Sequence, residues 1–172
     1  MAQKPLVGIV MGSDSDFKIM KKAAHVLKDF GIPFEIKVAS AHRTTDIALQ
    51  YAEKADSRGL KVIIAGAGAA AHLPGVLAAK TVLPVIGVPI HATPLNGLDA
   101  LYAIVQMPSG IPVATMAVDG AKNAALFAVQ LLANENLDLK KAFYQYKEQM
   151  LKEVQAKDQN VQQLWADEER KA

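Results

Sequence analysis

The feature that most constrains the fold is a regular alternation along the first three quarters of the chain. Short β-branched runs are each followed by small or polar residues and then by a helical pattern. This alternation is typical of repeated βαβ units. Strands are expected at residues 6–11, 34–39, 61–65, 85–88 and 112–117, and helices at residues 15–30, 45–57, 73–80, 98–106 and 121–133.

The predicted fold class is α/β. Because right-handed crossovers place helices on both faces of a parallel sheet, these elements predict a three-layer α/β/α sandwich. We expect a flavodoxin-like, doubly wound, five-stranded parallel sheet with the strand order 2-1-3-4-5. The first, third and fourth strands are nearly all apolar, so they should be buried on both faces.

The charged residues are distributed unevenly. Between Val62 and Val118 only Lys80 and Asp99 are charged, whereas residues 134–172 hold fifteen of the thirty-six charged residues. This nearly uncharged segment has more apolar surface than one small sheet needs to bury. It therefore predicts a homo-oligomer with apolar interfaces.

A membrane-spanning helix over residues 62–79 is the alternative explanation of this apolar segment. His72, Pro74 and three glycines within it disfavour that explanation. We therefore expect no membrane association.

The composition changes after Ala133 to a charged helical pattern. We divide the chain into an α/β domain, residues 1–133, and a C-terminal helical extension, residues 134–172, that packs on the oligomer. A helix here would run roughly 45 Å, longer than a small domain covers with its own surface. A solvated, partly frayed tail is the alternative. The apolar residues of the pattern are Leu139, Phe143, Tyr146, Met150, Val154, Val161 and Leu164.

Composition also excludes several classes of function. The net charge is only +2 and no basic run is present, which disfavours nucleic acid as a partner. The chain has no cysteine, so it has neither disulfides nor thiolate nucleophiles, and its four scattered histidines lack metal-ligand spacing. The first residues resemble no signal peptide, and we expect a cytoplasmic protein.

The most suggestive polar residues follow the first three strands, whose carboxyl ends should meet at one edge of the sheet. In the first loop, Ser13 and Ser15 offer hydroxyls and Asp16 suits a sugar diol. The free N–H groups that open the following helix favour an anion. The alternative is structural, with Ser15 or Asp14 capping the helix and Asp16 stabilising its positive end.

The second loop places His42 next to Arg43 at the end of a strand. Arg43 can bind a phosphate or carboxylate with two parallel hydrogen bonds, and a histidine can give and take a proton near neutral pH. A surface histidine beside a salt-bridged arginine is the alternative.

The third loop, GAGAAA at residues 66–71, fits the dinucleotide-binding pattern. That fingerprint belongs after the first strand, and no acidic residue lies about twenty residues further on, so NAD is disfavoured. We expect the small residues to let the backbone approach a flat ligand closely. His91, after the fourth strand, either lines the site or caps it, and His25 is expected to be structural.

Taken in order, these loops resemble the class I N5-carboxyaminoimidazole ribonucleotide mutases, the PurE family, also called the catalytic subunit of phosphoribosylaminoimidazole carboxylase. The likeness covers about residues 6–133. It rests on MGSDSD at 11–16, SAHRT at 40–44, AGAG at 65–68, AAHLPG at 70–75 and IVQMP at 104–108.

The resemblance implies an isomerase of de novo purine (IMP) biosynthesis, typically octameric, that uses no metal, ATP or organic cofactor. It moves a carboxylate from the exocyclic nitrogen of an aminoimidazole ribonucleotide to ring carbon C4, and the α/β domain is then the catalytic one. His42 would be the general acid/base. Substrate-binding residues would be Ser13, Asp16 and Arg43 at the ribose phosphate, with Ser15 beside them, and Ser40, Gly68, Ala70 and His72 around the imidazole and the migrating carboxylate.

Two rival functions remain. A relative of this family carboxylates aminoimidazole ribonucleotide directly with CO2, although AAHLPG at residues 70–75 resembles the mutase form. A non-enzymatic flavodoxin-like module that binds a phosphorylated metabolite would explain Arg43 but gives His42 no role. Three residues depart from the family pattern: Ala69 replaces a usual glycine, Thr45 a usual proline and Ala100 a common serine.

Overall fold

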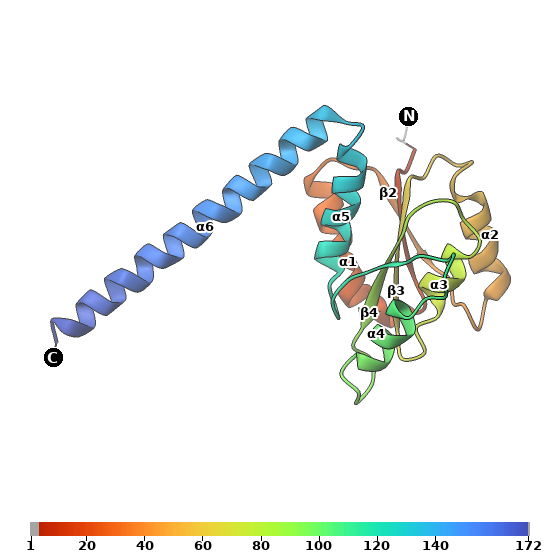
Figure 1. Ribbon diagram of the computed structural model, residues 1–172, viewed down its shortest axis with the longest axis horizontal. Helices are drawn as coiled ribbons and strands as arrows, with labels where there is room; N and C mark the ends of the chain where they lie inside the picture. Colours follow the sequence, from red (N-terminus) through yellow and green to blue (C-terminus); the bar gives the residue numbers. More distant parts are fainter. Residues whose placement is uncertain (1–3, 172) are drawn as a thin grey trace. The chain divides into compact units, whose positions relative to one another are not determined.

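The computed structural model describes residues 4–171 and contains the predicted five-stranded sheet. Its strand order is β2-β1-β3-β4-β5, and the four pairings are parallel (Figure 1). The strands are β1 (Val7–Met11), β2 (Phe34–Val38), β3 (Val62–Gly68), β4 (Val85–Ile90) and β5 (Ala114–Thr115). The predicted fold class and strand order are therefore confirmed.

The helices also lie where the sequence predicts them, with bounds that differ by a few residues. A short 3-10 helix, η1 (Asp14–Asp16), precedes the first α-helix. The α-helices are α1 (Phe17–Asp29), α2 (Thr45–Ala55), α3 (Leu73–Ala78), α4 (Leu98–Val105), α5 (Ala121–Ala133) and α6 (Leu137–Glu169).

The sheet lies between two layers of helices. Buried residues of α2, α3 and α4 form one apolar cluster with inward-facing residues of β1, β3 and β4, and α1 and α5 lie on the opposite face (Figure 1). Every residue of β1 and β4, and all of β3 except Gly68, is buried, as expected for strands covered on both faces. β2 lies at the edge of the sheet and is partly exposed.

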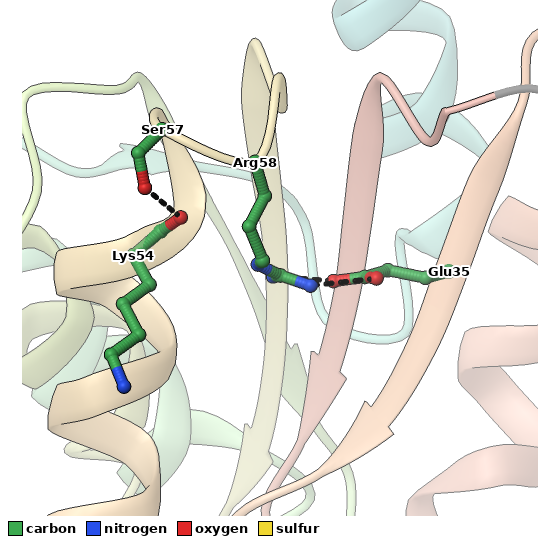
Figure 2. Close-up of polar contacts among 4 residues, drawn as sticks. All are labelled: Glu35, Lys54, Ser57 and Arg58. Carbon is green, nitrogen blue, oxygen red and sulfur yellow. Dashed lines mark hydrogen bonds and ion pairs between the residues drawn. The ribbon is translucent and has the colours of Figure 1, made fainter.

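The edge strand is tied to α2 through an ion pair. Arg58, just beyond α2, donates to both carboxylate oxygens of Glu35 on β2, at 2.9 and 2.6 Å (Figure 2). The guanidinium also lies 4.8 Å from the centre of the Tyr51 ring. Burial would raise the pKa of Glu35, but the hydrogen bonds and positive charge of Arg58 outweigh it and hold that pKa below its usual value.

The chain divides into two compact units, and the boundary lies between Leu132 and Ala133. The second unit consists mainly of α6, which has 33 residues and thus a length of about 50 Å. Asn136 caps its first turn by accepting hydrogen bonds from the N–H groups of Asp138 and Leu139, each at 3.0 Å. No residue of α6 is buried. Over residues 4–171, none of the helices is both long and apolar enough to cross a bilayer.

Candidate active site

The loops after β1, β2 and β3 meet at the carboxyl edge of the sheet and enclose a cavity of about 230 Å³. They are neighbours because β1 pairs with both β2 and β3, so the three strands end side by side. The cavity is lined by Gly12, Ser13, Ser15, Asp16, Ser40, Ala41, His42, Arg43, Ala67, Gly68, Ala69, Ala70, Leu73 and Ala92. The structure thus brings together all of the predicted site residues except His72.

The first loop is held by reciprocal hydrogen bonds between Ser13 and Asp16. The N–H of Ser13 donates to a carboxylate oxygen of Asp16 at 3.2 Å, and the N–H of Asp16 donates to the carbonyl oxygen of Ser13 at 3.2 Å. The Ser13 hydroxyl also accepts from the N–H of Ser15 at 3.4 Å. Ser13 is therefore the N-cap of the 3-10 helix η1, and the Asp14 carboxylate accepts from the same Ser15 N–H at 3.1 Å. Such a cap is worth about 1 kcal/mol.

Asp16 is only 7% exposed although it lines the cavity. Burial raises the pKa of its carboxyl, while hydrogen bonds from Ser13, Ser15 and Gly12 partly oppose that rise. A desolvated carboxylate with unused lone pairs is a strong acceptor for the hydroxyls of a ligand.

In the second loop, Ser40 organises the backbone around His42 and Arg43. Its hydroxyl accepts from the N–H groups of both residues, at 3.3 and 3.2 Å. Its own N–H donates to the Thr44 hydroxyl at 2.9 Å. This local network turns the chain directly after β2 and leaves the side chains of His42 and Arg43 exposed at the cavity.

Arg43 joins the first two loops. One guanidinium nitrogen, Nη2, donates to the carbonyl oxygen of Gly12 at 3.1 Å. A second hollow of about 300 Å³ adjoins the cavity and shares Gly12, Ser13, Ser40 and Arg43 with it. Because a guanidinium has five N–H donors, Arg43 keeps donors for an anion in either space.

Gly66 and Gly68, expected in the third loop, lie at the end of β3, and both serve packing. A Cβ on Gly66 would collide with Met20 of α1, and a Cβ on Gly68 would lie 2.6 Å from that of Ala92. These glycines thus let other parts of the protein approach the backbone. Gly68 also lines the cavity, so the close approach of a ligand to this residue stays a prediction. Ala69 follows with φ +52°, in the left-handed region that favours glycine.

His72 lies directly before α3 and contacts His42. His42 Nε2 and His72 Nδ1 are 2.8 Å apart, and the two rings are nearly perpendicular at 88°. The residues that line the cavity do not include His72, but its ring contacts that of His42, which does line it. Which of the two nitrogens donates depends on the tautomers.

Two lining residues that sequence reasoning missed are Leu73, at the start of α3, and Ala92, just after β4. Ala92 follows β4, which pairs with β3. Its position beyond the carboxyl end of a neighbouring strand could therefore have indicated that it lines the site. His91 does not line the cavity, and its N–H donates to Asp119 Oδ1 at 3.1 Å. His25 is exposed on α1. Within residues 4–171, no three His, Cys, Asp or Glu side chains are grouped so that they could hold a metal ion.

The fold and the site define a class: doubly wound α/β proteins whose small-molecule site lies beyond the carboxyl ends of neighbouring central strands. The site combines an imidazole, a guanidinium and the N–H groups that open a helix, a set suited to an anionic ligand and proton transfer.

Comparison with known proteins identifies the family within that class. The chain matches the AIR carboxylase family over residues 6–153 and belongs to it. It is 56% identical over 163 residues to an N5-carboxyaminoimidazole ribonucleotide mutase of Pyrococcus horikoshii, covering 95% of this chain and 92% of that protein. It is 53% identical over 160 residues to the mutase of Thermotoga maritima, covering 93% and 94%.

Solved structures agree with this assignment. Treponema denticola PurE matches with a TM-score of 0.82 at 30% identity, covering 91% of this chain and 98% of that one. A variant of Treponema denticola PurE2 matches with a TM-score of 0.84 at 29% identity, covering 92% and 98%.

Proposed function

We propose that this protein is an N5-carboxyaminoimidazole ribonucleotide mutase, an isomerase of purine biosynthesis that uses no cofactor and acts in the cytoplasm. It moves the carboxylate from the exocyclic nitrogen to C4 and yields 4-carboxy-5-aminoimidazole ribonucleotide. The observation that carries this proposal is the convergence of His42, Arg43 and Asp16 on one cavity in a chain more than half identical to proteins named as this mutase.

In the proposed allocation, the ribose phosphate portion binds Ser13, Ser15, Asp16 and Arg43. The hydroxyls and guanidinium supply donors, and the buried Asp16 carboxylate accepts from the sugar hydroxyls. The imidazole ring and its carboxylate then lie beside Ser40, Gly68 and Ala70, which line the same cavity as His42.

His42 is proposed to move the protons. As the bond between the exocyclic nitrogen and the carboxyl carbon breaks, that nitrogen gains a proton, which yields CO2 and a neutral aminoimidazole. After C4 attacks CO2, the C4 proton must leave. One imidazole that first gives and then takes a proton serves both steps. The small apolar side chains of Ala67 and Ala70 suit a pocket that keeps CO2 beside C4.

The direct test compares two substrates with purified protein, the N5-carboxy compound alone and aminoimidazole ribonucleotide with bicarbonate. The proposal expects a strong preference for the N5-carboxy compound. A marked preference for aminoimidazole ribonucleotide with bicarbonate would make the protein a direct carboxylase, which is the rival function within the family.

The matched control is His42→Asn. The mutase should keep ligand binding and lose turnover by about a hundredfold or more, as expected when a general acid/base is removed. A protein that binds the nucleotide, shows no turnover and is unchanged by this substitution would be the non-enzymatic module instead.

We also propose a homo-oligomer, with an octamer as the expected form. The support is an exposed apolar stripe on α4, where Leu98, Tyr102 and Val105 are each more than half exposed. They recur at the i, i+4, i+7 spacing of one helix face. Val82, in the same nearly uncharged segment, is 88% exposed. Apolar surface of this kind is typical of association sites.

A further inference from the structure

The cavity is poorly matched in charge to the ligand proposed for it. The side chains that line it and the adjoining hollow include one permanent cation, Arg43, and two carboxyl groups, Asp14 and Asp16. The N5-carboxy compound carries a phosphate and a carboxylate, and thus about three negative charges at neutral pH. The lining residues alone therefore offer no net positive charge that would attract this compound from solution.

A stripe of lysines runs along α1, the helix that leads away from the cavity. This helix begins directly after Asp16 and contains four lysines. Its buried residues, among them Met20 and Leu27, lie on the other side of the helix, so the lysines face solvent. We call the four exposed residues the lysine stripe: Lys18, Lys21, Lys22 and Lys28.

The positive charge of the lysine stripe is not neutralised by neighbouring side chains. Within residues 4–171, the ion pairs involve the cations Arg58, Lys80 and Arg170 and none of the stripe lysines. The one acidic residue of α1 is Asp29, its last residue. Helix α5, which lies on the same face of the sheet, contains no acidic residue (Figure 1). The stripe therefore produces a field of a single sign beside the site.

The first three lysines of the stripe lie near the cavity. Lys18, Lys21 and Lys22 follow Asp16 by two, five and six residues, which is at most about 9 Å along the helix axis. Salt screens charges over about 8 Å at physiological ionic strength. Lys28 lies about 18 Å along the axis from Asp16, where screening is nearly complete. The three lysines at the start of α1 can thus act on an anion that approaches the cavity.

We infer that Lys18, Lys21 and Lys22 form an electrostatic guide that draws the anionic nucleotide toward the cavity, an inference that rests on the proposed function. A patch of one sign raises the local concentration of an oppositely charged ligand and the rate at which it meets the site. The guide needs no direct contact with the bound nucleotide. Its effect belongs to kcat/KM, because kcat describes the complex after binding.

The kinetic test neutralises the three lysines together, as Lys18→Gln, Lys21→Gln and Lys22→Gln. Conversion of the N5-carboxy compound is measured over a range of salt concentrations. At roughly 0.02 M ionic strength, kcat/KM should be about three- to tenfold below wild type, with kcat within about twofold. At roughly 0.5 M, kcat/KM of the two proteins should agree within about twofold, because salt screens the charges.

The matched control also removes three exposed lysines, as Lys4→Gln, Lys54→Gln and Lys61→Gln. These residues lie at the opposite edge of the sheet, before β1, in the last turn of α2 and before β3. The five residues of β1 span about 17 Å, roughly two screening lengths, between the two edges. The control should therefore keep kcat/KM within about twofold of wild type at every salt concentration.

Charge reversal gives a second measure of the same effect. Lys18→Glu, Lys21→Glu and Lys22→Glu together change the charge by twice as much as the glutamine variant. The loss of kcat/KM at low salt should then be about the square of the loss in the glutamine variant, roughly ten- to a hundredfold. Acidic residues near the start of a helix are favourable, so these substitutions should not disturb the fold.

Three kinetic outcomes would overturn the inference. They are a wild-type kcat/KM in the glutamine variant at low salt, an equal loss in the control, and a loss that persists at high salt, which would indicate direct contact with the nucleotide. A change of mass by light scattering would also overturn it, since the stripe would then be a contact between copies. Failure of wild type to convert the N5-carboxy compound would instead contradict the proposed function, so the two failures are distinguishable.

Discussion

Ser13 and Asp16 illustrate at the residue scale how one pair can serve both structure and ligand binding. Their reciprocal hydrogen bonds close the first loop. Both also line the cavity. Capping and ligand binding are alternatives when only the sequence is considered. A cap orients the remaining N–H groups and hydroxyls before a ligand arrives, so the two roles are compatible.

Ala69 gives the first residue-scale prediction. Its φ of +52° costs a residue with a Cβ about 1 kcal/mol or more relative to glycine. Ala69→Gly removes that strain but gives the unfolded chain more freedom, which offsets part of the gain. We expect the free energy of unfolding to rise by about 0.5 kcal/mol, measured by urea denaturation at fixed protein concentration.

The matched control is Ala70→Gly at the next position, which has no positive φ. Here only the cost in unfolded-state freedom applies, so this variant should be less stable than wild type by about 0.5–1 kcal/mol. Equal destabilisation by both substitutions would contradict a strained backbone at Ala69.

At the scale of elements, the Glu35–Arg58 pair gives a pH-dependent prediction. Because the pKa of Glu35 is lowered from 4.5 in the folded protein, the pair stabilises the fold above pH 4.5, and this stabilisation is lost as the pH falls through the lowered pKa. Glu35→Gln should cost at most about 1 kcal/mol near neutral pH, since the pair is partly exposed.

Urea denaturation of wild type and Glu35→Gln between pH 3 and 7, roughly the range in which carboxyl groups titrate, measures this difference. Glu53→Gln is the control, because the contact of Glu53 with Lys80 is longer, at 3.4 Å, and more exposed. It should change stability little. If the difference in free energy of unfolding between wild type and Glu35→Gln stayed constant down to the lowest pH, the proposed role of the pair would be contradicted.

The sequence predicted the existence and order of the elements better than their ends. β3 continues to Gly68, three residues beyond the prediction, because it pairs with β4 as far as Ile90. β5 keeps two of the six predicted residues, since it lies at the sheet edge and pairs only with Ile86 and Gly87. Strand length depends on the partner strand, which periodicity along one segment does not reveal.

At the scale of the whole molecule, the convergence of three loops was predictable, because neighbouring parallel strands end at the same edge. The contact between His42 and His72 was not. His72 was expected in the pocket, and its actual contact depends on where α3 begins and how the third loop turns, which are tertiary properties. The packing of Gly66 against Met20 also depends on tertiary structure, so the sequence did not predict it.

Assembly provides the whole-molecule prediction. The exposed apolar stripe of α4 predicts a stable oligomer at micromolar concentration, measured by light scattering. Leu98→Lys together with Tyr102→Lys should shift the protein toward smaller species, because charges at an apolar interface lack partners. Gln50→Lys, at an exposed polar position on α2, is a control for added charge. A stable monomer in wild type would refute the predicted oligomer. An unchanged mass in the double variant would show that the α4 stripe is not its interface.

The central claim is that one cavity at the carboxyl edge of β1, β2 and β3 holds the nucleotide beside the imidazole of His42. A crystal structure of His42→Asn with the N5-carboxy compound tests it most directly, because this variant should bind without converting its ligand. We predict the phosphate at Arg43 and Ser13, and the aminoimidazole within hydrogen-bond reach of the side chain at position 42. A ligand bound elsewhere, such as in the apolar hollow of about 570 Å³ beside Val82, Pro112 and Phe127, would contradict the account.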